Sequence, residues 1–220
     1  MKYILKLGSI SIENNKKQYT IQSSFKTGKS FIIDYLSNVN LNLFGYSNDY
    51  TYTFNTSSVE TLTDVMENVK NDGLQYHEVS DYLYNIYDII EYLESKNKTV
   101  ISFDLTDFIV VDRAKLLFVN EDKIIDIDEK NQINITRPIK KNMFISPELK
   151  LMNQIPYVVN YKQLYFNIGL LIYYMLFGEL LDSTSISTDI KMDLIRETGI
   201  YWFLHRSLEK DINNRTLLLI

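Results

Sequence analysis

The sequence predicts an α+β protein, because strand-like segments dominate the first quarter of the chain and helix-like segments dominate the remainder. Residues 1–56 contain short runs of alternating apolar and polar residues separated by turn residues, which is typical of strands. From residue 57 onward, apolar residues mostly recur at helical spacing. The hydrophobic fraction of 45% is sufficient for a chain of 220 residues to bury a core.

The first region, residues 1–56, is predicted to contain four strands: Tyr3–Ile12, Gln18–Ser23, Leu41–Ser47 and Tyr50–Asn55. Turns are expected at Asn14-Asn15 and at Ser47–Asp49. The apolar run Ser30–Ser37 is too short for its periodicity to distinguish a helix from a strand.

The second region, residues 57–220, is predicted to be mainly helical. A first helix is expected to begin at an N-cap formed by Ser57-Ser58 and to end at Gly73. The other expected helices are Val79–Lys96, Tyr161–Gly178, Asp189–Glu197 and Ile200–Leu208. Between them lie three β-rich runs and one polar stretch expected to be a loop: Val100–Val111, Leu116–Asn120, Ile124–Ile127 and the loop Glu129–Asn142.

One apolar segment, Leu164–Leu181, has two interpretations. A membrane-spanning helix needs about 20 mostly apolar residues, and this segment approaches that length. A helix at the centre of a globular core is also apolar on every side. We favour the buried helix, because no basic cluster closely flanks either end of the segment.

Composition excludes several kinds of site. The chain has no cysteine, which excludes disulfides, thiolate metal sites and a cysteine nucleophile, and its two histidines lie far apart in the sequence. The net charge of −5 argues against unspecific nucleic-acid binding. The excess of Ile, Asn, Lys and Tyr, with one alanine in the whole chain, suggests an AT-rich genome such as that of a large DNA virus or a parasite.

The order of these elements, together with several short motifs, resembles the eukaryotic-type protein kinase superfamily. Ser146-Pro147-Glu148 is similar to the motif that ends the activation segment, and Tyr165–Gly178 is similar to the central F helix, with Gly169 and Gly178 at matching spacing. Leu208–Arg215 resembles the last conserved motif of the fold. The resemblance implies a bilobal kinase-like fold, with a small reduced β-rich N-lobe (1–56) and a mainly helical C-lobe (57–220).

The resemblance also implies structural roles for three residues. In the family, the glutamate of the first motif pairs with the arginine of the last, which here implies an ion pair between Glu148 and Arg215. Gly169 falls where the helical lobe needs a glycine.

The nucleotide-binding features of the family are degenerate in the first 56 residues. The glycine-rich loop keeps only Gly8, and the position of the third-strand lysine corresponds to Gln22. Lys26 and Lys29 lie nearby but would require a shifted register, and the chain has no glutamate between residues 22 and 50 to pair with a lysine.

The catalytic loop and the metal-binding motif are degenerate as well. Asp104 matches the catalytic aspartate and Asp107 stands close by in the sequence, but the asparagine position holds Phe108 or Ile109. The metal-binding aspartate position holds Asn120, a weaker ligand for Mg²⁺, with Asp122 as its rival in what looks like a hairpin turn. Leu164 replaces the aspartate that opens the F helix.

These losses predict a pseudokinase that acts as a scaffold or regulatory binding partner of other proteins. No catalytic residue, metal or cofactor is then expected, and Asp104, Asp107 and Asp122 are ordinary surface or turn aspartates. The alternative is a divergent active Ser/Thr kinase, with Asp104 and Asp107 in catalysis, Asn120 and Asp122 holding metal, and ATP and Mg²⁺ as cofactors. We expect a cytoplasmic protein without a membrane span, in the host cytoplasm or the virion if it is viral.

Overall fold

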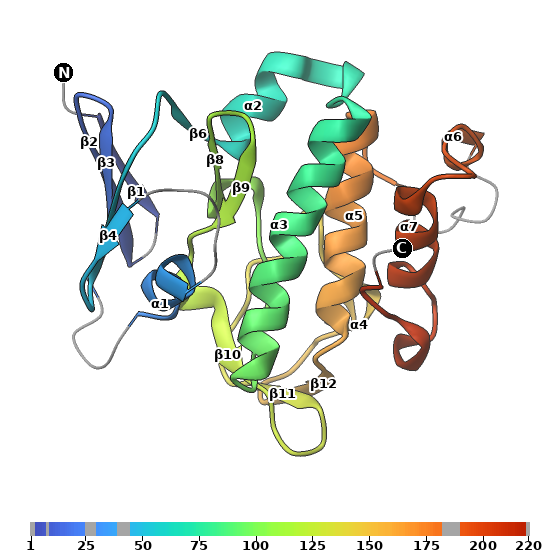
Figure 1. The fold of residues 1–220 in the computed structure, drawn as a ribbon. Coiled ribbons are helices and arrows are strands. Elements are labelled where there is room, and N and C mark those ends of the chain that lie inside the picture. Colours follow the sequence, from blue (N-terminus) through green and yellow to red (C-terminus); the bar gives the residue numbers. More distant parts are fainter. Residues whose placement is uncertain (1–2, 8, 25–29, 39–44, 182–189, 219–220) are drawn as a thin grey trace.

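Figure 1 shows the computed structural model, which describes residues 3–7, 9–24, 30–38, 45–181 and 190–218. The fold is α+β, as predicted from the sequence. A five-stranded sheet stands at one side of the molecule, and long helices stand at the other (Figure 1). The larger of two apolar clusters runs from the strands of this sheet to the helices.

The five-stranded sheet is antiparallel throughout and has the order β1-β2-β3-β5-β4. Its strands are β1 (Tyr3–Leu7), β2 (Ile10–Asn15), β3 (Gln18–Ser23), β4 (Gly45–Ser47) and β5 (Thr51–Asn55). The predicted single strand Tyr3–Ile12 is therefore wrong, since it forms two strands in which Leu7 pairs with Ile10. The next turn lies at Lys16-Lys17, both with positive φ, as the commonest two-residue hairpins require.

The ambiguous run after β3 is a helix, α1 (Phe31–Asn38), and it covers the sheet through four buried side chains: Ile32, Ile33, Tyr35 and Leu36. Its other neighbour is the long helix α3 (Tyr76–Ser95), where the rings of Tyr35 and Tyr92 lie 5.5 Å apart. Most of the predicted strand Leu41–Ser47 lies outside the described residues, and β4 is the part that is described.

A second sheet has three antiparallel strands: β6 (Val59–Thr61), β8 (Phe108–Val111) and β9 (Lys115–Phe118). The helix predicted to begin at Ser57-Ser58 begins later, as α2 (Leu62–Val69), and continues as the 3₁₀ turn η1 (Lys70–Asp72). Thr61 is its N-cap, because Thr61 and Asp64 form a capping box. Ser57 and Ser58 instead donate hydrogen bonds to Asp112 in the β8–β9 turn.

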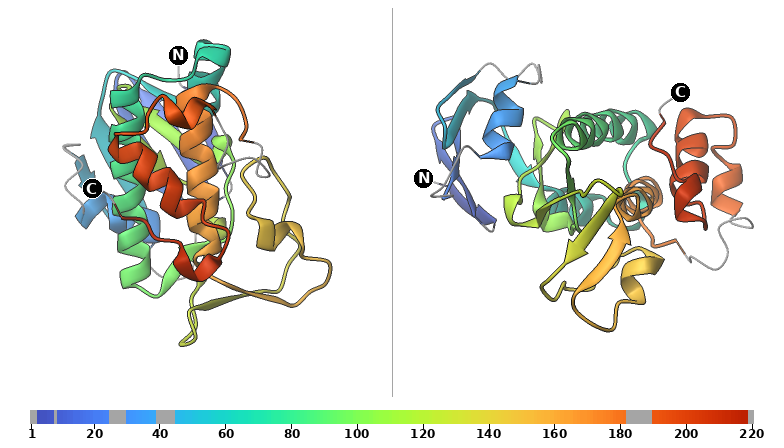
Figure 2. Two further views of the ribbon diagram at one scale, coloured as in Figure 1. Left: turned by 90° about the vertical axis from the view of Figure 1, so that its right-hand side faces the viewer. Right: turned by 90° about the horizontal axis from the view of Figure 1, so that it is seen from below.

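The helical side is built around α5 (Gln163–Phe177), which packs between α3 and α7 (Gly199–Ser207), as Figure 2 shows. Thirteen of the fifteen residues of α5 are buried, which explains its apolar composition. The helix ends at Gly178, a left-handed C-cap with φ +66°. No helix in the described parts of the chain has both the length and the apolar character to span a membrane.

Three smaller elements complete the helical side and were not predicted: α4 (Pro147–Lys150), β11 (Gln132–Ile135) and β12 (Tyr157–Asn160). The strands β11 and β12 pair with each other, so the predicted loop Glu129–Asn142 is a strand in part. They cover a second apolar cluster centred on Ile133, Ile145 and Leu149. The helix predicted at Asp189–Glu197 is shorter, α6 (Ile190–Asp193).

Candidate functional site

The β8–β9 hairpin brings the candidate catalytic and metal-binding residues together. The 3₁₀ turn η2 (Leu105–Asp107) directly precedes β8, and η3 (Glu121–Lys123) follows β9. Because the strands are antiparallel, with Phe108 opposite Phe118, both turns lie at the same end of the hairpin. A backbone hydrogen bond of 2.9 Å from Val119 N–H to the Asp107 carbonyl closes this end.

Asp107 is the centre of the resulting polar cluster. Its side chain is only 4% exposed, and it forms an ion pair with Lys123 at 2.5 Å. The amide of Asn120 donates to Oδ1 at 2.6 Å, and the backbone N–H of Asp104 donates to Oδ2, also at 2.6 Å. Asp107 therefore lies in a turn, as one of the two expectations had it, but it is a buried carboxylate paired with a lysine and not a surface aspartate.

Asp104 and Asp122 lie at the margins of this cluster. Asp104 is half-buried and is the N-cap of η2, where its Oδ1 accepts from Leu105 N–H at 2.9 Å. Asp122 is exposed on η3. The segment around Asp122 is not the hairpin turn that was expected, because β9 pairs with β8, whereas β10 (Ile124–Asp126) pairs with β7 (Lys98–Val100).

Glu121 is a second buried carboxylate, which the sequence did not identify. It is 4% exposed, and it accepts hydrogen bonds from Ser30 Oγ at 2.7 Å and Phe31 N–H at 2.6 Å, at the start of α1. Ser23 Oγ, at the end of β3, donates to the same carboxylate at 3.3 Å. Glu121 thus joins the five-stranded sheet and α1 to the β8–β9 hairpin.

The residues expected to form a degenerate nucleotide site do not gather in one place. Gln22 is exposed, because side chains alternate along β3 and its neighbour Ser23 points inward toward Glu121. Asn120 contacts Asp107 instead. Gly8, Lys26 and Lys29 lie outside the described residues.

Aromatic side chains pack against one another around Phe103 and Phe108, the sequence neighbours of Asp104 and Asp107. Phe108, at the position expected to hold the family asparagine, is buried, and its ring lies 5.2 Å from that of Phe103 and 5.5 Å from that of Phe118. Phe103 also packs against Phe144, with ring centroids 6.1 Å apart. Ile10, in the strand after Gly8, is fully buried. Among the described residues, no group of three or more His, Asp or Glu side chains is arranged to hold a metal ion.

Glu148 and Arg215 lie in direct contact, as the resemblance implied. Arg215 Nη2 is 2.7 Å and Nη1 is 3.0 Å from the two carboxylate oxygens of Glu148. The guanidinium is fully buried, lies 4.8 Å over the ring of Phe166 in α5, and donates from Nε to the Glu209 carbonyl at 2.7 Å. The pair therefore attaches α4 to the end of the chain.

Gln163, the first residue of α5, is a support that the sequence reasoning missed. Its Nε2 donates to the Ile101 carbonyl at 2.9 Å, and its Oε1 accepts from Ser146 Oγ at 3.2 Å. It therefore connects α5 both to the segment before Asp104 and to the start of α4. The neighbouring Leu164, which was expected to stand in place of the aspartate that opens the F helix, is a fully buried apolar residue.

Gly169 allows α5 and α7 to approach closely. A Cβ at this position would lie 2.6 Å from Ser207 Oγ and 2.8 Å from Leu208 Cδ2, so one of these side chains would have to shift to admit it. The glycine therefore fits the close packing of the two helices.

Comparison with known proteins does not assign this site to a family. No protein-family model matches the chain, and no curated protein matches it.

Proposed function

We propose that this protein is a catalytically inactive, kinase-like binding protein, in which a reduced β-rich lobe and a helical lobe form a scaffold for a protein partner. The sequence motifs are the first support. The placement of the five-stranded sheet with α1 on one side, and of α3, α5 and α7 on the other, is compatible with a bilobal arrangement. The contact between Glu148 and Arg215 joins the two motifs that carry the resemblance.

The proposed absence of catalysis rests mainly on the hydrogen bonds and the ion pair of Asp107. Phosphoryl transfer depends on carboxylates that hold Mg²⁺ and orient the substrate hydroxyl. Both oxygens of Asp107 are already bonded to donors of the protein itself: Lys123, Asn120 and the backbone of Asp104. A metal ion or a substrate would have to displace these donors from a buried position, which costs free energy.

Glu121 supports the same conclusion from the other side of the cluster. Its carboxylate binds the start of α1 and the end of β3, where a kinase places the lysine that contacts ATP. Among the residues that the structure describes, the partners of this carboxylate are Ser23, Ser30 and the backbone N–H of Phe31, and none of them is a cation. These described partners supply no positive charge for phosphates.

The test compares thermal unfolding of the full chain with and without millimolar ATP and Mg²⁺, together with phosphate transfer from labelled ATP. We expect no shift of the unfolding midpoint and no transfer. A ligand at 100 times its Kd would stabilise the protein by about 2.7 kcal/mol, so binding would be visible. Transfer that is abolished by Asp104→Asn would establish the active-kinase alternative and overturn the proposal.

A further inference from the structure

A pocket of about 380 Å³ lies beside the polar cluster, between β10 and the loop that follows β11. Five isoleucines contribute to its lining: Ile101, Ile124, Ile125, Ile135 and Ile139. This volume falls in the range of ligand-binding pockets. The pocket is therefore large enough to receive apolar side chains of a partner.

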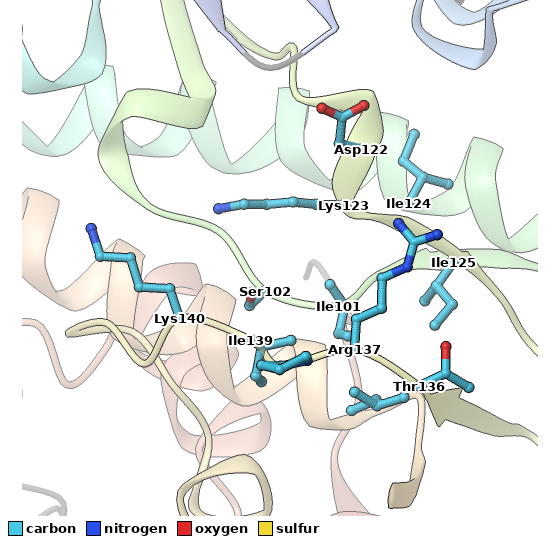
Figure 3. A pocket seen from close by; sticks show the side chains of 12 residues that line it. Ile101, Ser102, Asp122, Lys123, Ile124, Ile125, Thr136, Arg137, Ile139 and Lys140 are labelled. Carbon is cyan, nitrogen blue, oxygen red and sulfur yellow. The ribbon is translucent and has the colours of Figure 1, made fainter. Parts of the chain in front are cut away.

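Positive side chains surround this apolar floor. Arg137 and Lys140 come from one loop, and their side chains extend on either side of Ile139 and Ile101, as Figure 3 shows. Lys123 approaches from η3, and Asp122 is the one carboxylate among the lining residues. Because Asp107 offsets the charge of Lys123, Arg137 and Lys140 against Asp122 leave this spot with a net positive charge, on a chain whose net charge is −5.

The two loop cations are available to a partner. Arg137 and Lys140 are exposed, and neither forms an ion pair with any residue that the structure describes. Lys123 differs, because its ammonium is bound to Asp107. Arg137 and Lys140 are therefore the two cations of the pocket that a negatively charged partner would contact.

The loop that carries these cations is held at its far end. Lys141 Nζ donates to the Lys150 carbonyl at 2.9 Å, and Asn142 Oδ1 accepts from Phe144 N–H at 3.0 Å. The side-chain amide of Asn142 also donates to the Phe103 carbonyl. A wall that is ordered before binding reduces the entropy that a ligand must overcome.

We propose that this pocket binds an acidic peptide segment of a protein partner, with an apolar side chain on the isoleucines and flanking carboxylates on Arg137 and Lys140. A small anion alone would leave the apolar floor unused, and an apolar peptide would leave the two cations unpaired. The overall negative charge repels acidic segments elsewhere on the surface, so charge complementarity favours this spot. The inference rests on the proposed role as a binding protein, and it names the chemistry of the partner.

The probe is a set of fluorescein-labelled dodecapeptides with a central leucine and glutamates at varied flanking positions, measured by fluorescence anisotropy with the full chain. We expect the best glutamate peptide to bind at least about tenfold more tightly than its glutamine counterpart, with affinity that falls as salt rises. The double variant Arg137→Glu/Lys140→Glu should lose at least about this factor. Ile139→Ser should weaken binding with little change in its salt dependence.

The matched control is Lys130→Glu/Arg196→Glu, which makes the same change of net charge at exposed positions outside the pocket. It should bind the peptide as tightly as the unmodified chain. The proposal would be overturned if the control lost as much peptide affinity as the double variant, or if the glutamine peptide bound as tightly as the glutamate peptide. It would also be overturned if inorganic phosphate competed with the peptide while Ile139→Ser left peptide binding unchanged. If charge reversal unfolds the loop, the neutral variant Arg137→Gln/Lys140→Gln replaces it in the test and must show the same loss of peptide affinity. The ATP experiment is independent, so either proposal can fail alone.

Discussion

Glu148 and Arg215, which are 67 residues apart in the chain, form a two-point ion pair whose partners differ in exposure. The guanidinium of Arg215 is fully buried, whereas the side chain of Glu148 is 21% exposed. Removing Glu148 therefore leaves a charge that water cannot reach, and removing Arg215 leaves a carboxylate that water can partly hydrate. The two partners are not equivalent for stability.

This asymmetry gives the first prediction. We expect Glu148→Ala to lower the free energy of unfolding by about 3–5 kcal/mol, the range for breaking a buried pair. Arg215→Met should cost less, because its apolar chain keeps contact with Phe166. Urea unfolding measures both. Asp126, whose side chain is 83% exposed in its ion pair with Lys98, provides the control: Asp126→Ala should cost less than about 1 kcal/mol. Equal costs for Glu148→Ala and Asp126→Ala would contradict the argument.

The second prediction concerns the charge of Asp107. Asp107→Asn places an amide N–H₂ against one of three donors, and we expect a loss of about 1–3 kcal/mol, since a buried group is left without its partner. Asp122→Asn, at an exposed position, is the control and should leave stability unchanged. A catalytic aspartate would behave differently: its asparagine variant would keep or gain stability and lose phosphate transfer.

The third prediction follows the contacts of Glu121. In Glu121→Gln, one carboxylate oxygen becomes a donor and no longer accepts from Ser30 or from Phe31 N–H. We expect amide hydrogen exchange to become faster in α1 while α5 keeps its protection, because α5 makes none of these contacts. Glu129→Gln, at an exposed position in the chain, is the matched control. A uniform loss of protection across both helices would refute a local role.

The fourth prediction tests the approach of α5 to α7. Gly169→Ala gains helix propensity but places its Cβ against Ser207 and Leu208. We expect a net loss of about 1–3 kcal/mol, as is usual for overpacking. Combining it with Ser207→Ala should recover part of the loss, which thermal unfolding of the two variants would measure. A stabilised Gly169→Ala variant would show that the helices can move apart.

The fifth prediction is a pH dependence. Partial burial raises the pKa of Asp112, but hydrogen bonds from the hydroxyl and N–H of Ser57 and from Ser58 N–H outweigh it and hold the pKa below its ordinary value of 3.8. A lowered pKa stabilises the fold above the unfolded value, and this stability disappears as pH falls through the folded value. Asp112→Asn should therefore be less stable than the unmodified chain at pH 7, and the difference should vanish at the acid end of a Tm series. Asparagine tolerates the positive φ of this position.

Sequence patterns best predicted the helices whose pattern of buried and exposed residues stays the same along their length. The segment after Gln163 is apolar on every side and is a buried helix, and α3 keeps one period over 20 residues. The start of α2 was placed too early because Val59–Thr61 is too short to show a period and pairs with β8, far along the chain. The turn that divides the predicted first strand into β1 and β2 was missed because each of the two strands is also too short to show a period.

The candidate site was predicted less well, because the state of a carboxylate depends on its partners. Nothing local distinguishes Asp107 from Asp122, yet the first is buried against Lys123 and the second is exposed. Glu121 receives its donors from residues 90 to 98 positions earlier, a relationship that periodicity does not contain. The contact of Glu148 with Arg215 was anticipated only through a family resemblance.

The long sequence separation of the Glu121 contacts also bears on how the chain is made. The five strands of the sheet all lie within residues 3–55, so their pairing needs no later part of the chain. The hydroxyl of Ser30 and the N–H of Phe31, in contrast, cannot bind the Glu121 carboxylate until residue 121 has been synthesised. A nascent chain that stops before that point carries a paired sheet whose α1 lacks its contacts with Glu121. Truncated chains ending before and after Glu121 should therefore differ in protease sensitivity at α1.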